Sequence, residues 1–355
     1  RDFRFKARVW EMSSTETICP GCSRGCNMYS WVRNNEILRQ TPRYNPEVNE
    51  FWMCDSGRLN TFKHVNVENR IKAPLMKKDE GVLEVGWDEA VARVASESKT
   101  FKKSEIAALG SAYATNEENY LFQKFASDVL GTKHIDFMHH TLEGDEDRFL
   151  IRADKTPNSR GARAVGVRPR DGGLDFNGIT KAIREGHIKA LYVLDDNIAA
   201  DPAVAQSLAR LEFLVVMCSF ENDTTRLAEV VLPSSTFAEK HGTFTNFQGR
   251  VQRIRPSVAT FDQDRALDGF AMSRLDKFGS PFDRWAKGTK RDCRPIWRIV
   301  AGIAAVMGMK YKYNTSEDVF NEIVNTIPSF KGLSYRKIGN KGMMLRLKQE
   351  AAVPA

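Results

Sequence analysis

The sequence predicts an α/β fold in three parts, and one observation on each part supports this prediction. Residues 1–72 combine a cysteine-rich loop with short stretches typical of strands. In residues 73–256, apolar runs alternate with amphipathic segments, and residues 257–355 hold a linker, helices and a basic tail. Alternating strands and helices favour a parallel sheet with right-handed crossovers. We therefore predict a small β-rich module, a parallel-sheet α/β domain and a short helical C-terminal region.

The first part predicts three short strands. Residues 3–9 alternate apolar with charged side chains, the period-two pattern of a half-buried strand. Residues 28–32 and 36–38 favour two more strands, with Asn34 and Asn35 supplying the turn between them. A module this small cannot bury a large core, so we expect a bound metal centre to add to its stability.

The second part predicts buried strands at residues 105–110, 190–194 and 213–218. Asn116 is a candidate N-cap for the clearest helix, and Asp201 with the proline after it starts another. Strands in this order form a parallel sheet, whose ligands bind beyond the carboxyl ends of the strands.

The remaining segments predict connections and two late helices. Residues 145–175 are polar and glycine-rich, which favours a long irregular connection. The chain is linker-like from about residue 257 to residue 294. Helices are predicted near residues 296–308 and 316–327, the second ended by Pro328.

Four cysteines have the spacing C-x2-C-x3-C-x27-C, at Cys19, Cys22, Cys26 and Cys54. The first three lie in a loop with two glycines and a proline, which can bend its thiolates around one point. Four thiolates gathered in this way suit a cubane [4Fe–4S] cluster, in which each iron takes one cysteine. We therefore predict one [4Fe–4S] cluster, with these four cysteines as its binding residues and metal ligands.

Zinc is the competing metal for this motif. Zinc sites made of four cysteines usually pair one C-x2-C with a second, whereas here the second half offers only Cys54. Unmetallated thiols rank third, and disulfides last, because six cysteines in 355 residues is ordinary usage. Cys218 lies in an apolar run and is predicted to be a core residue, and Cys293 stands alone.

Composition excludes several classes of protein. The chain is 42% hydrophobic and 28% charged, as in soluble globular proteins, and it has no apolar run of about 18 residues, so no membrane span is predicted. The net charge is +8, but its basic residues are not interleaved with aromatic ones. We expect a solvated face or a docking surface for an acidic partner, and no nucleic acid. Without an initial methionine, the chain is expected to be mature, trimmed or part of a longer polypeptide.

Residues 19–58 resemble the cluster-binding module of the molybdopterin oxidoreductase superfamily. More specifically, roughly residues 1–255 resemble the G-type large iron–sulfur subunit of bacterial NADH–quinone oxidoreductase, respiratory complex I. The motifs that support this resemblance are residues 8–11, 54–58, 70–75, 86–90, 154–158, 191–196, 228–233, 239–246 and 249–252.

The resemblance implies a [4Fe–4S] module in residues 1–72 and a molybdopterin-oxidoreductase-like α/β domain in residues 73–256. It implies an iron–sulfur electron-transfer and scaffold subunit of the peripheral arm of such a complex. The expected partners are the other subunits, on the cytoplasmic side of the bacterial inner membrane, with no direct membrane span. No catalytic residue is expected in this chain, and whether it counts as an enzyme is left open.

The sequence also departs from the family pattern. Ser56 stands where the molybdenum and tungsten members carry a lysine, and no cysteine between Cys54 and Cys218 could serve as a ligand for such a metal. We therefore expect no active molybdopterin. The alternative is a compact molybdopterin-dependent oxidoreductase of the formate dehydrogenase or nitrate reductase type, binding its pterin through loops near Gly110 and Asp195.

Three other constellations have a structural and a functional interpretation. His139 and His140 lie beside an acidic run at residues 143–147, but adjacent residues of a strand point to opposite sides, so a surface loop is favoured. Residues 239–241 contain an acid and a base without a nucleophile, which favours a structural role. Residues 110–112 could bind phosphate at a helix N-terminus, although the G-x-G-x-x-G pattern is missing.

Overall fold

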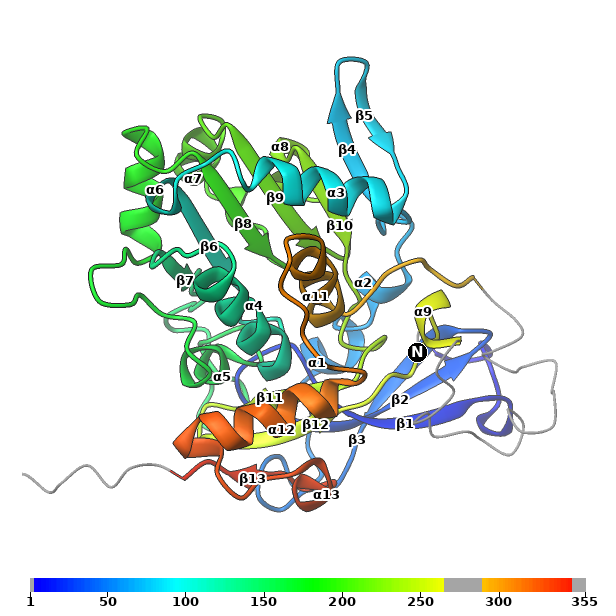
Figure 1. The fold of residues 1–355 in the computed structure, drawn as a ribbon. Helices are drawn as coiled ribbons and strands as arrows, with labels where there is room; N and C mark the ends of the chain where they lie inside the picture. The colour runs from blue at the N-terminus through cyan, green and yellow to red at the C-terminus, as the bar shows by residue number, and fades with distance from the viewer. Residues whose placement is uncertain (1–2, 265–288, 347–355) are drawn as a thin grey trace, which may run out of the picture.

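The N-terminal part is built on a three-stranded antiparallel sheet. The computed structural model describes residues 3–264 and 289–346. Strands β1 (Ser13–Ile18), β2 (Asn27–Arg33) and β3 (Glu36–Pro42) pair in the order β1-β2-β3 (Figure 1). Asn34 and Asn35 have φ angles of 52° and 60° between β2 and β3, a conformation that asparagine tolerates well. The predicted strand–turn–strand is therefore confirmed.

The strand predicted at the very start of the chain is wrong. Residues 3–6 form a turn and Val9–Glu11 form a short 3₁₀-helix, η1. Phe5 is 84% exposed and has a φ of 70°, and Trp10 is 73% exposed. The alternating pattern failed here because no neighbouring strand pairs with this segment in the described residues and no core covers its apolar side. Two short helices, α1 (Asp55–Leu59) and α2 (Lys63–Asn66), complete the module.

The central sheet has seven strands in the described part of the chain, in the order β5-β4-β10-β9-β8-β6-β7. Strands β10, β9, β8, β6 and β7 are parallel, and the β4–β5 hairpin extends the β10 edge and stands out from the body (Figure 1). The parallel sheet predicted from the alternating pattern is confirmed. The strands are β4 (Leu75–Lys78), β5 (Gly81–Glu84), β6 (Ile106–Gly110), β7 (Ile135–Phe137), β8 (Ala190–Leu194), β9 (Phe213–Cys218) and β10 (Val230–Pro233).

Helices cover both faces of this sheet. Successive strand residues point to opposite faces, so Tyr192 of β8 joins one hydrophobic core while Leu191 and Val193 join the other. The first core contains α3, α4, α11 and α12, and the second contains α6 and α7. The helices of the described residues outside the first module are α3 (Trp87–Glu97), α4 (Asn116–Asp128), α5 (Ser159–Ala164), α6 (Phe176–Arg184), α7 (Pro202–Leu208), α8 (Asp223–Leu227), α9 (Phe261–Asp264), α11 (Ile296–Val306), α12 (Ser316–Thr326) and α13 (Tyr335–Ile338), with the 3₁₀-helices η2 (Lys103–Glu105), η3 (Ile198–Ala200) and η4 (Pro328–Phe330).

Most predicted helices are found, with small shifts at their starts. The N-cap of α4 is Thr115 rather than Asn116, and Thr115 and Glu118 form a capping box there. Both late helices, α11 and α12, are confirmed, and α11 packs against α3 and α4. The connection predicted at residues 145–175 is irregular except for α5. Most of the predicted linker, residues 265–288, lies outside the described residues.

The C-terminal region closes back onto the N-terminal module. Strands β11 (Gly242–Thr245), β12 (Arg250–Ile254) and β13 (Met343–Met344) form a third, antiparallel sheet, and β12 contacts β1. Arg43 donates a hydrogen bond of 2.8 Å to the backbone oxygen of Asn340. The segment predicted as a basic tail is therefore folded as α13 and β13 up to residue 346.

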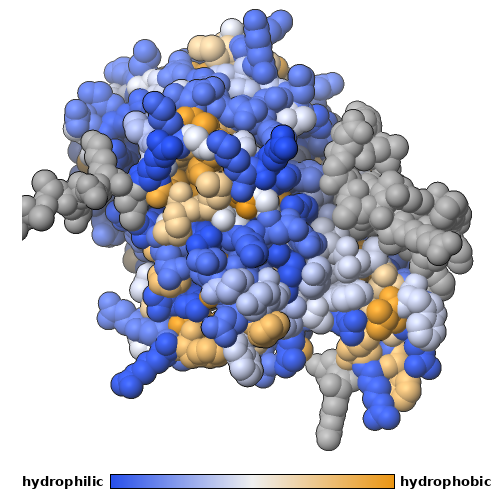
Figure 2. Space-filling model, turned by 90° about the horizontal axis from the view of Figure 1, so that it is seen from below, coloured by the Kyte–Doolittle hydropathy of each residue, from blue (hydrophilic) through white to orange (hydrophobic). Residues whose placement is uncertain are grey.

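The surface is mostly polar. Figure 2, which views the molecule from below, shows a largely hydrophilic face with separate hydrophobic patches. Among the described residues, no helix has the length and apolar character needed to cross a membrane.

Candidate metal centre

The first three cysteines lie on the connection between β1 and β2. Cys19 directly follows β1 and Cys26 directly precedes β2, and the Cys19 N–H donates to the Cys26 carbonyl at 2.8 Å. Gly25 has a φ of +65°, a left-handed conformation that glycine adopts without strain, and its N–H donates to the Cys22 carbonyl. The antiparallel pairing of β1 and β2 thus folds the loop so that its cysteines come together.

Cys54 reaches the same place from the start of α1. It is the N-cap of that helix, and its Sγ accepts a hydrogen bond of 3.2 Å from the Gly57 N–H. A Cβ atom on Gly57 would lie 3.0 Å from the Cys19 Sγ and 3.3 Å from the Cys54 Sγ. Glycine at position 57 therefore lets the helix backbone approach the sulfur atoms closely.

All four cysteines line one cavity of about 190 Å³. The other residues that line it include Gly21, Met53, Ser56, Asp145, Leu150 and Lys155. The sequence prediction that these four residues come together is thus matched by their positions. Ser56, which stands where a lysine is found in the molybdenum and tungsten members, also lines the cavity.

The electrostatics of the cavity call for a positive centre. Burial and the neighbouring Cys26 raise the pKa of the Cys19 thiol, and burial with the charge of Cys22 raises the pKa of Cys26 to about 12. Burial also raises the pKa of Cys22. Ionising several thiols together here is unfavourable unless a metal compensates their charge. The donor set thus fits a bound metal centre made of more than one cation.

The size of the cavity distinguishes a cluster from a single ion. Zinc binds thiolates at about 2.3 Å, so four sulfur atoms must converge on one point. In the described residues, no group of three or more His, Cys, Asp or Glu side chains is arranged to hold a metal ion in that way. The thiols instead surround a space of about 190 Å³, which suits a multi-iron cluster held at its corners.

A second cavity of about 490 Å³ adjoins the first one. Gly21 and Lys155 line both cavities. The parallel strands run in the order β7-β6-β8-β9-β10, which is 2-1-3-4-5 along the chain, so the topological switch point lies between β6 and β8. Tyr113, after β6, and the Asp195–Asn197 loop, after β8, line this cavity. The second cavity therefore lies where ligands bind in this type of sheet.

His140 and Asp196 form a pair in this second cavity. The His140 Nε2 lies 2.9 Å from the carboxylate of Asp196, whose side chain is only 2% exposed. Burial alone would lower the pKa of His140, but the hydrogen bond and charge of Asp196 outweigh it and raise that pKa. This contact was missed from the sequence because the two residues are 56 positions apart.

The adjacent histidines separate as the strand argument predicted. The His139 Nε2 lies 2.7 Å from an Arg163 nitrogen at the surface, whereas His140 turns inward. The prediction of a surface loop holds for the acidic residues 143–147, which are exposed, but it is wrong for His140.

The loop at residues 110–112 uses its donors internally. The Ser111 N–H donates to Asn119 at 3.2 Å, and the Tyr113 N–H donates to the Ser111 hydroxyl at 3.0 Å. The start of α4 is capped by Thr115. These contacts weaken the case for a phosphate site at this helix N-terminus.

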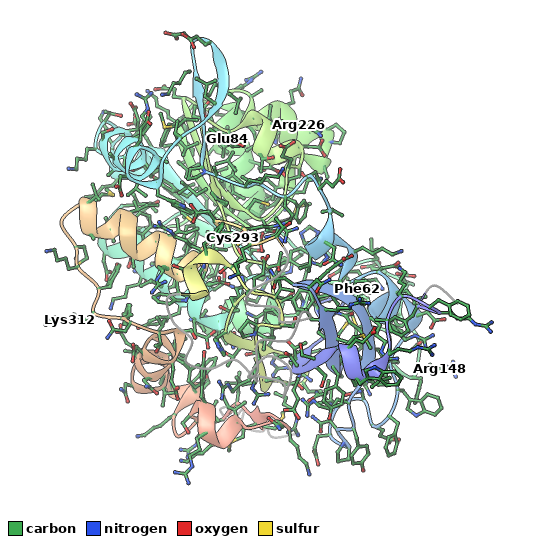
Figure 3. All side chains as sticks on the ribbon, turned by 90° about the vertical axis from the view of Figure 1, so that its right-hand side faces the viewer. Phe62, Glu84, Arg148, Arg226, Cys293 and Lys312 are labelled. Carbon is green, nitrogen blue, oxygen red and sulfur yellow. The ribbon has the colours of Figure 1, made fainter. Side chains whose placement is uncertain are left out.

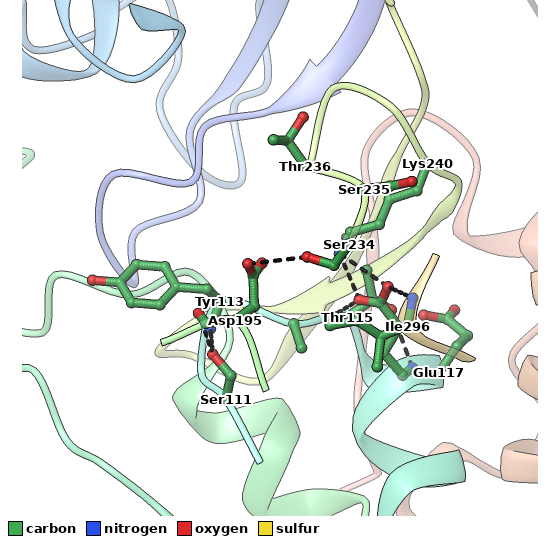
Figure 4. Close-up of polar contacts among 12 residues, drawn as sticks. Ser111, Tyr113, Thr115, Glu117, Asp195, Ser234, Ser235, Thr236, Lys240 and Ile296 are labelled. Atoms are coloured by element: carbon green, nitrogen blue, oxygen red, sulfur yellow. Dashed lines mark hydrogen bonds and ion pairs between the residues drawn. The ribbon is translucent and has the colours of Figure 1, made fainter. Parts of the chain in front are cut away.

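Residues 239–241 lie in a network of buried charges. Lys240 contacts Glu118 at 2.7 Å and 3.0 Å, and both side chains are at most 1% exposed. Glu239 pairs with Arg70 at 2.7 Å and 3.1 Å, again fully buried. Figure 4 shows Lys240 beside Ser234 and Ile296, whose backbone N–H also donates to Glu118. These pairings support the structural role that was predicted for the segment.

Glu117, next to this network, makes the stability of the protein pH-dependent. Burial raises its pKa from 4.5 to about 7, despite hydrogen bonds from Thr243 and Tyr335. In the unfolded chain, Glu117 ionises near its ordinary value, so its contribution to the free energy of unfolding falls as pH rises from about 4.5 to 7. We expect Glu117→Gln to gain about 3 kcal/mol relative to the wild type over this range.

Urea unfolding of both proteins at about pH 5 and about pH 8 measures this difference. His64 and His241, whose pKa values burial lowers to about 4, titrate equally in both proteins and cancel. A stability difference that does not change with pH would contradict the raised pKa of Glu117.

The two remaining cysteines lie away from the metal cavity. Cys218 is 1% exposed on β9, which confirms its prediction as a core residue. Cys293 is fully buried near the middle of the molecule (Figure 3), where its Sγ lies 3.9 Å from an Arg70 nitrogen. Burial raises the pKa of both thiols.

Two segments of the chain match known families. Residues 12–66 match the molybdopterin oxidoreductase Fe4S4 domain, and residues 158–266 match the molybdopterin oxidoreductase family. The predicted resemblance to this superfamily is confirmed. The first match contains all four cysteines of the cavity, and the second contains the Asp195–Asn197 loop of the second cavity.

Curated relatives match parts of the chain. NADH-quinone oxidoreductase subunit 3 of Thermus thermophilus is 39% identical over 139 residues, covering 39% of this chain and 17% of that protein. Another NADH-quinone oxidoreductase subunit, from Streptomyces coelicolor, is 32% identical over 149 residues, covering 42% and 17%. A putative formate dehydrogenase of Staphylococcus aureus is 32% identical over 155 residues, covering 42% and 16%. The matched stretches thus span about a sixth of each relative.

A solved structure supports the fold. Acetylene hydratase from Pelobacter acetylenicus has a TM-score of 0.55 over 94% of this chain and 74% of its own. The sequence identity is 9%, so this similarity concerns the fold alone.

Proposed function

We propose that this chain is an iron–sulfur electron-transfer and scaffold subunit of an NADH–quinone oxidoreductase-like complex. Cys19, Cys22, Cys26 and Cys54 would hold one [4Fe–4S] cluster, which supplies one-electron transfer when bound. The observation that carries this proposal is that these four thiols line one cavity inside a segment matching an Fe4S4 domain. The relatives named as NADH-quinone oxidoreductase subunits support the type of complex.

The surrounding residues have definable tasks in this proposal. The N–H of Gly57 donates to the Cys54 sulfur, which stabilises its thiolate form. Met53 and Leu150 line the cavity with apolar groups and limit the access of water, a factor that sets cluster potentials. The α/β domain, with its helices on both faces of the sheet, would mainly hold neighbouring subunits in position.

We further propose that the chain binds no active molybdopterin. The second cavity is lined by two adjacent aspartates, Asp195 and Asp196, and by no cysteine among the described residues. The alternative, a compact molybdopterin-dependent oxidoreductase, is favoured by the formate dehydrogenase relatives and by the position of that cavity at the switch point of the sheet. Its pterin would have to lie between the loops near Gly110 and Asp195.

The proposed partners are the other subunits of the complex, and the proposed place is the peripheral arm on the cytoplasmic side of the bacterial inner membrane. This assignment rests on the names of the partial relatives.

Metal analysis of the anaerobically purified chain tests the proposal. We expect about four irons per chain, no stoichiometric molybdenum or tungsten, and an EPR signal after dithionite reduction. A matched pair of variants sharpens the test, because Cys22→Ala should lose iron while Cys218→Ala should keep it. Stoichiometric molybdenum or tungsten would favour the alternative enzyme, and zinc without iron would contradict electron transfer.

A further inference from the structure

Lys155 has a fixed position between the two cavities. Its side chain is 19% exposed and lines both the cysteine cavity and the second cavity. The ammonium group lies 2.7 Å from the backbone oxygen of Asp145, 2.7 Å from the Asp145 carboxylate and 3.0 Å from the backbone oxygen of Arg152. A lysine has three N–H donors, so these three acceptors hold its charge in one place.

The backbone around Lys155 is tied to the cysteine loop. The Ser23 N–H, next to Cys22, donates to the Asp154 carbonyl at 2.9 Å, and the Lys155 N–H donates to the His140 carbonyl at 2.9 Å. Burial raises the pKa of Cys22, whereas the backbone N–H groups of Arg152 and Arg24 and the charge of Lys155 act in the opposite direction. The positive charge of Lys155 therefore acts on the cysteine sulfurs.

The two charges at the cavity wall differ in their exposure to solvent. The Asp145 side chain is 69% exposed, against 19% for Lys155. Water and salt screen an exposed charge more than a partly buried one. Lys155 should therefore outweigh Asp145 in the field at the cavity, even though the two side chains form an ion pair.

We propose that Lys155 raises the reduction potential of the cluster held by the four cysteines, and that Asp145 opposes it. This inference rests on the proposed function, because it requires a bound cluster. Reduction adds one negative charge to the cluster, and a fixed positive charge at the cavity wall stabilises that reduced state. The protein thus sets the electron affinity of the centre by a residue that is not a ligand, at a distance of more than 100 positions from the cysteines along the chain.

EPR-monitored redox titration of the iron-loaded chain and three variants tests this proposal. In Lys155→Met, the ratio of reduced to oxidised cluster at a fixed potential should fall by about tenfold, which is about 59 mV for a one-electron couple. Lys155→Arg keeps the charge and should stay close to the wild type. Asp145→Asn keeps an oxygen for the hydrogen bond but loses the negative charge, so its ratio should rise.

Opposite signs for the two charge-removing variants are what a structural disturbance would not produce. An unchanged potential in Lys155→Met, at an iron content equal to that of the wild type, would overturn the proposal. A fall in the ratio for Asp145→Asn would overturn it as well, and this exposed residue can be tested even if Lys155→Met does not fold. Absence of iron from the wild-type chain would instead contradict the proposed function.

Discussion

Replacing Cys22 with serine is expected to destabilise the subunit more than it slows electron transfer in the assembled complex. The cluster would link the β1–β2 loop to the start of α1, across the 27 residues that separate Cys26 from Cys54. Losing this link should lower the free energy of unfolding by at least the amount typical for a native disulfide of a small domain, roughly 2–5 kcal/mol. Metal binding stabilises a fold whenever the site exists only in the folded chain.

Anaerobic urea unfolding of the iron-loaded proteins measures this effect. Cys218→Ala is the matched control, because Cys218 is equally buried but lies on β9, outside the metal cavity. Its loss should be about 1 kcal/mol, as for a small truncation in a core. A Cys22→Ser complex that assembles normally and keeps its stability, yet loses turnover, would show that the cluster carries current rather than structure.

The metal site could be predicted from the sequence because its information is mostly local. Cys19, Cys22 and Cys26 lie within eight residues on one loop, so their spacing limits the possible geometry. The strands of the sheet were also predictable, since β8 and β9 are short apolar runs separated by a capped helix. The division into residues 1–72, 73–256 and 257–355 remains a prediction.

Other features depend on contacts that the sequence does not contain. The strand predicted at residues 3–9 has the right pattern, but a strand also needs a partner, and none pairs with it in the described residues. His140 meets Asp196 across 56 positions, and Lys240 meets Glu118 across 122. The side of Lys155 that faces the cysteines depends on the path of an irregular connection. Such pairings follow from the topology of the sheet rather than from any local motif.

Replacing Glu118 with glutamine should cause a large loss of stability. Glu118 and Lys240 are at most 1% exposed, so the change leaves a buried ammonium without its carboxylate. Breaking a buried ion pair on one side typically costs about 3–5 kcal/mol. The exposed pair of Lys78 and Glu89 has a similar distance of 2.8 Å and provides the control, because Glu89→Gln should cost less than about 1 kcal/mol.

A double-mutant cycle with Lys240→Met separates the pair from its surroundings. The double variant Glu118→Gln with Lys240→Met should lose less stability in urea than the sum of the two single variants, because no unpaired charge remains. Additive losses, or a loss below about 1 kcal/mol in Glu118→Gln alone, would mean that water reaches Lys240 and that the pair is not truly buried.

Glu118 also accepts hydrogen bonds from backbone groups, which makes this pair different from an isolated one. Its carboxylate accepts from the N–H of Thr115, at the start of α4, and from the N–H of Ile296, at the start of α11. Glutamine keeps an oxygen for such a donor, whereas leucine leaves both N–H groups unsatisfied. The double variant Glu118→Leu with Lys240→Met should therefore lose about 1–3 kcal/mol more than the Gln–Met variant. This difference measures how strongly the carboxylate joins α11 to the central sheet domain, independently of its charge.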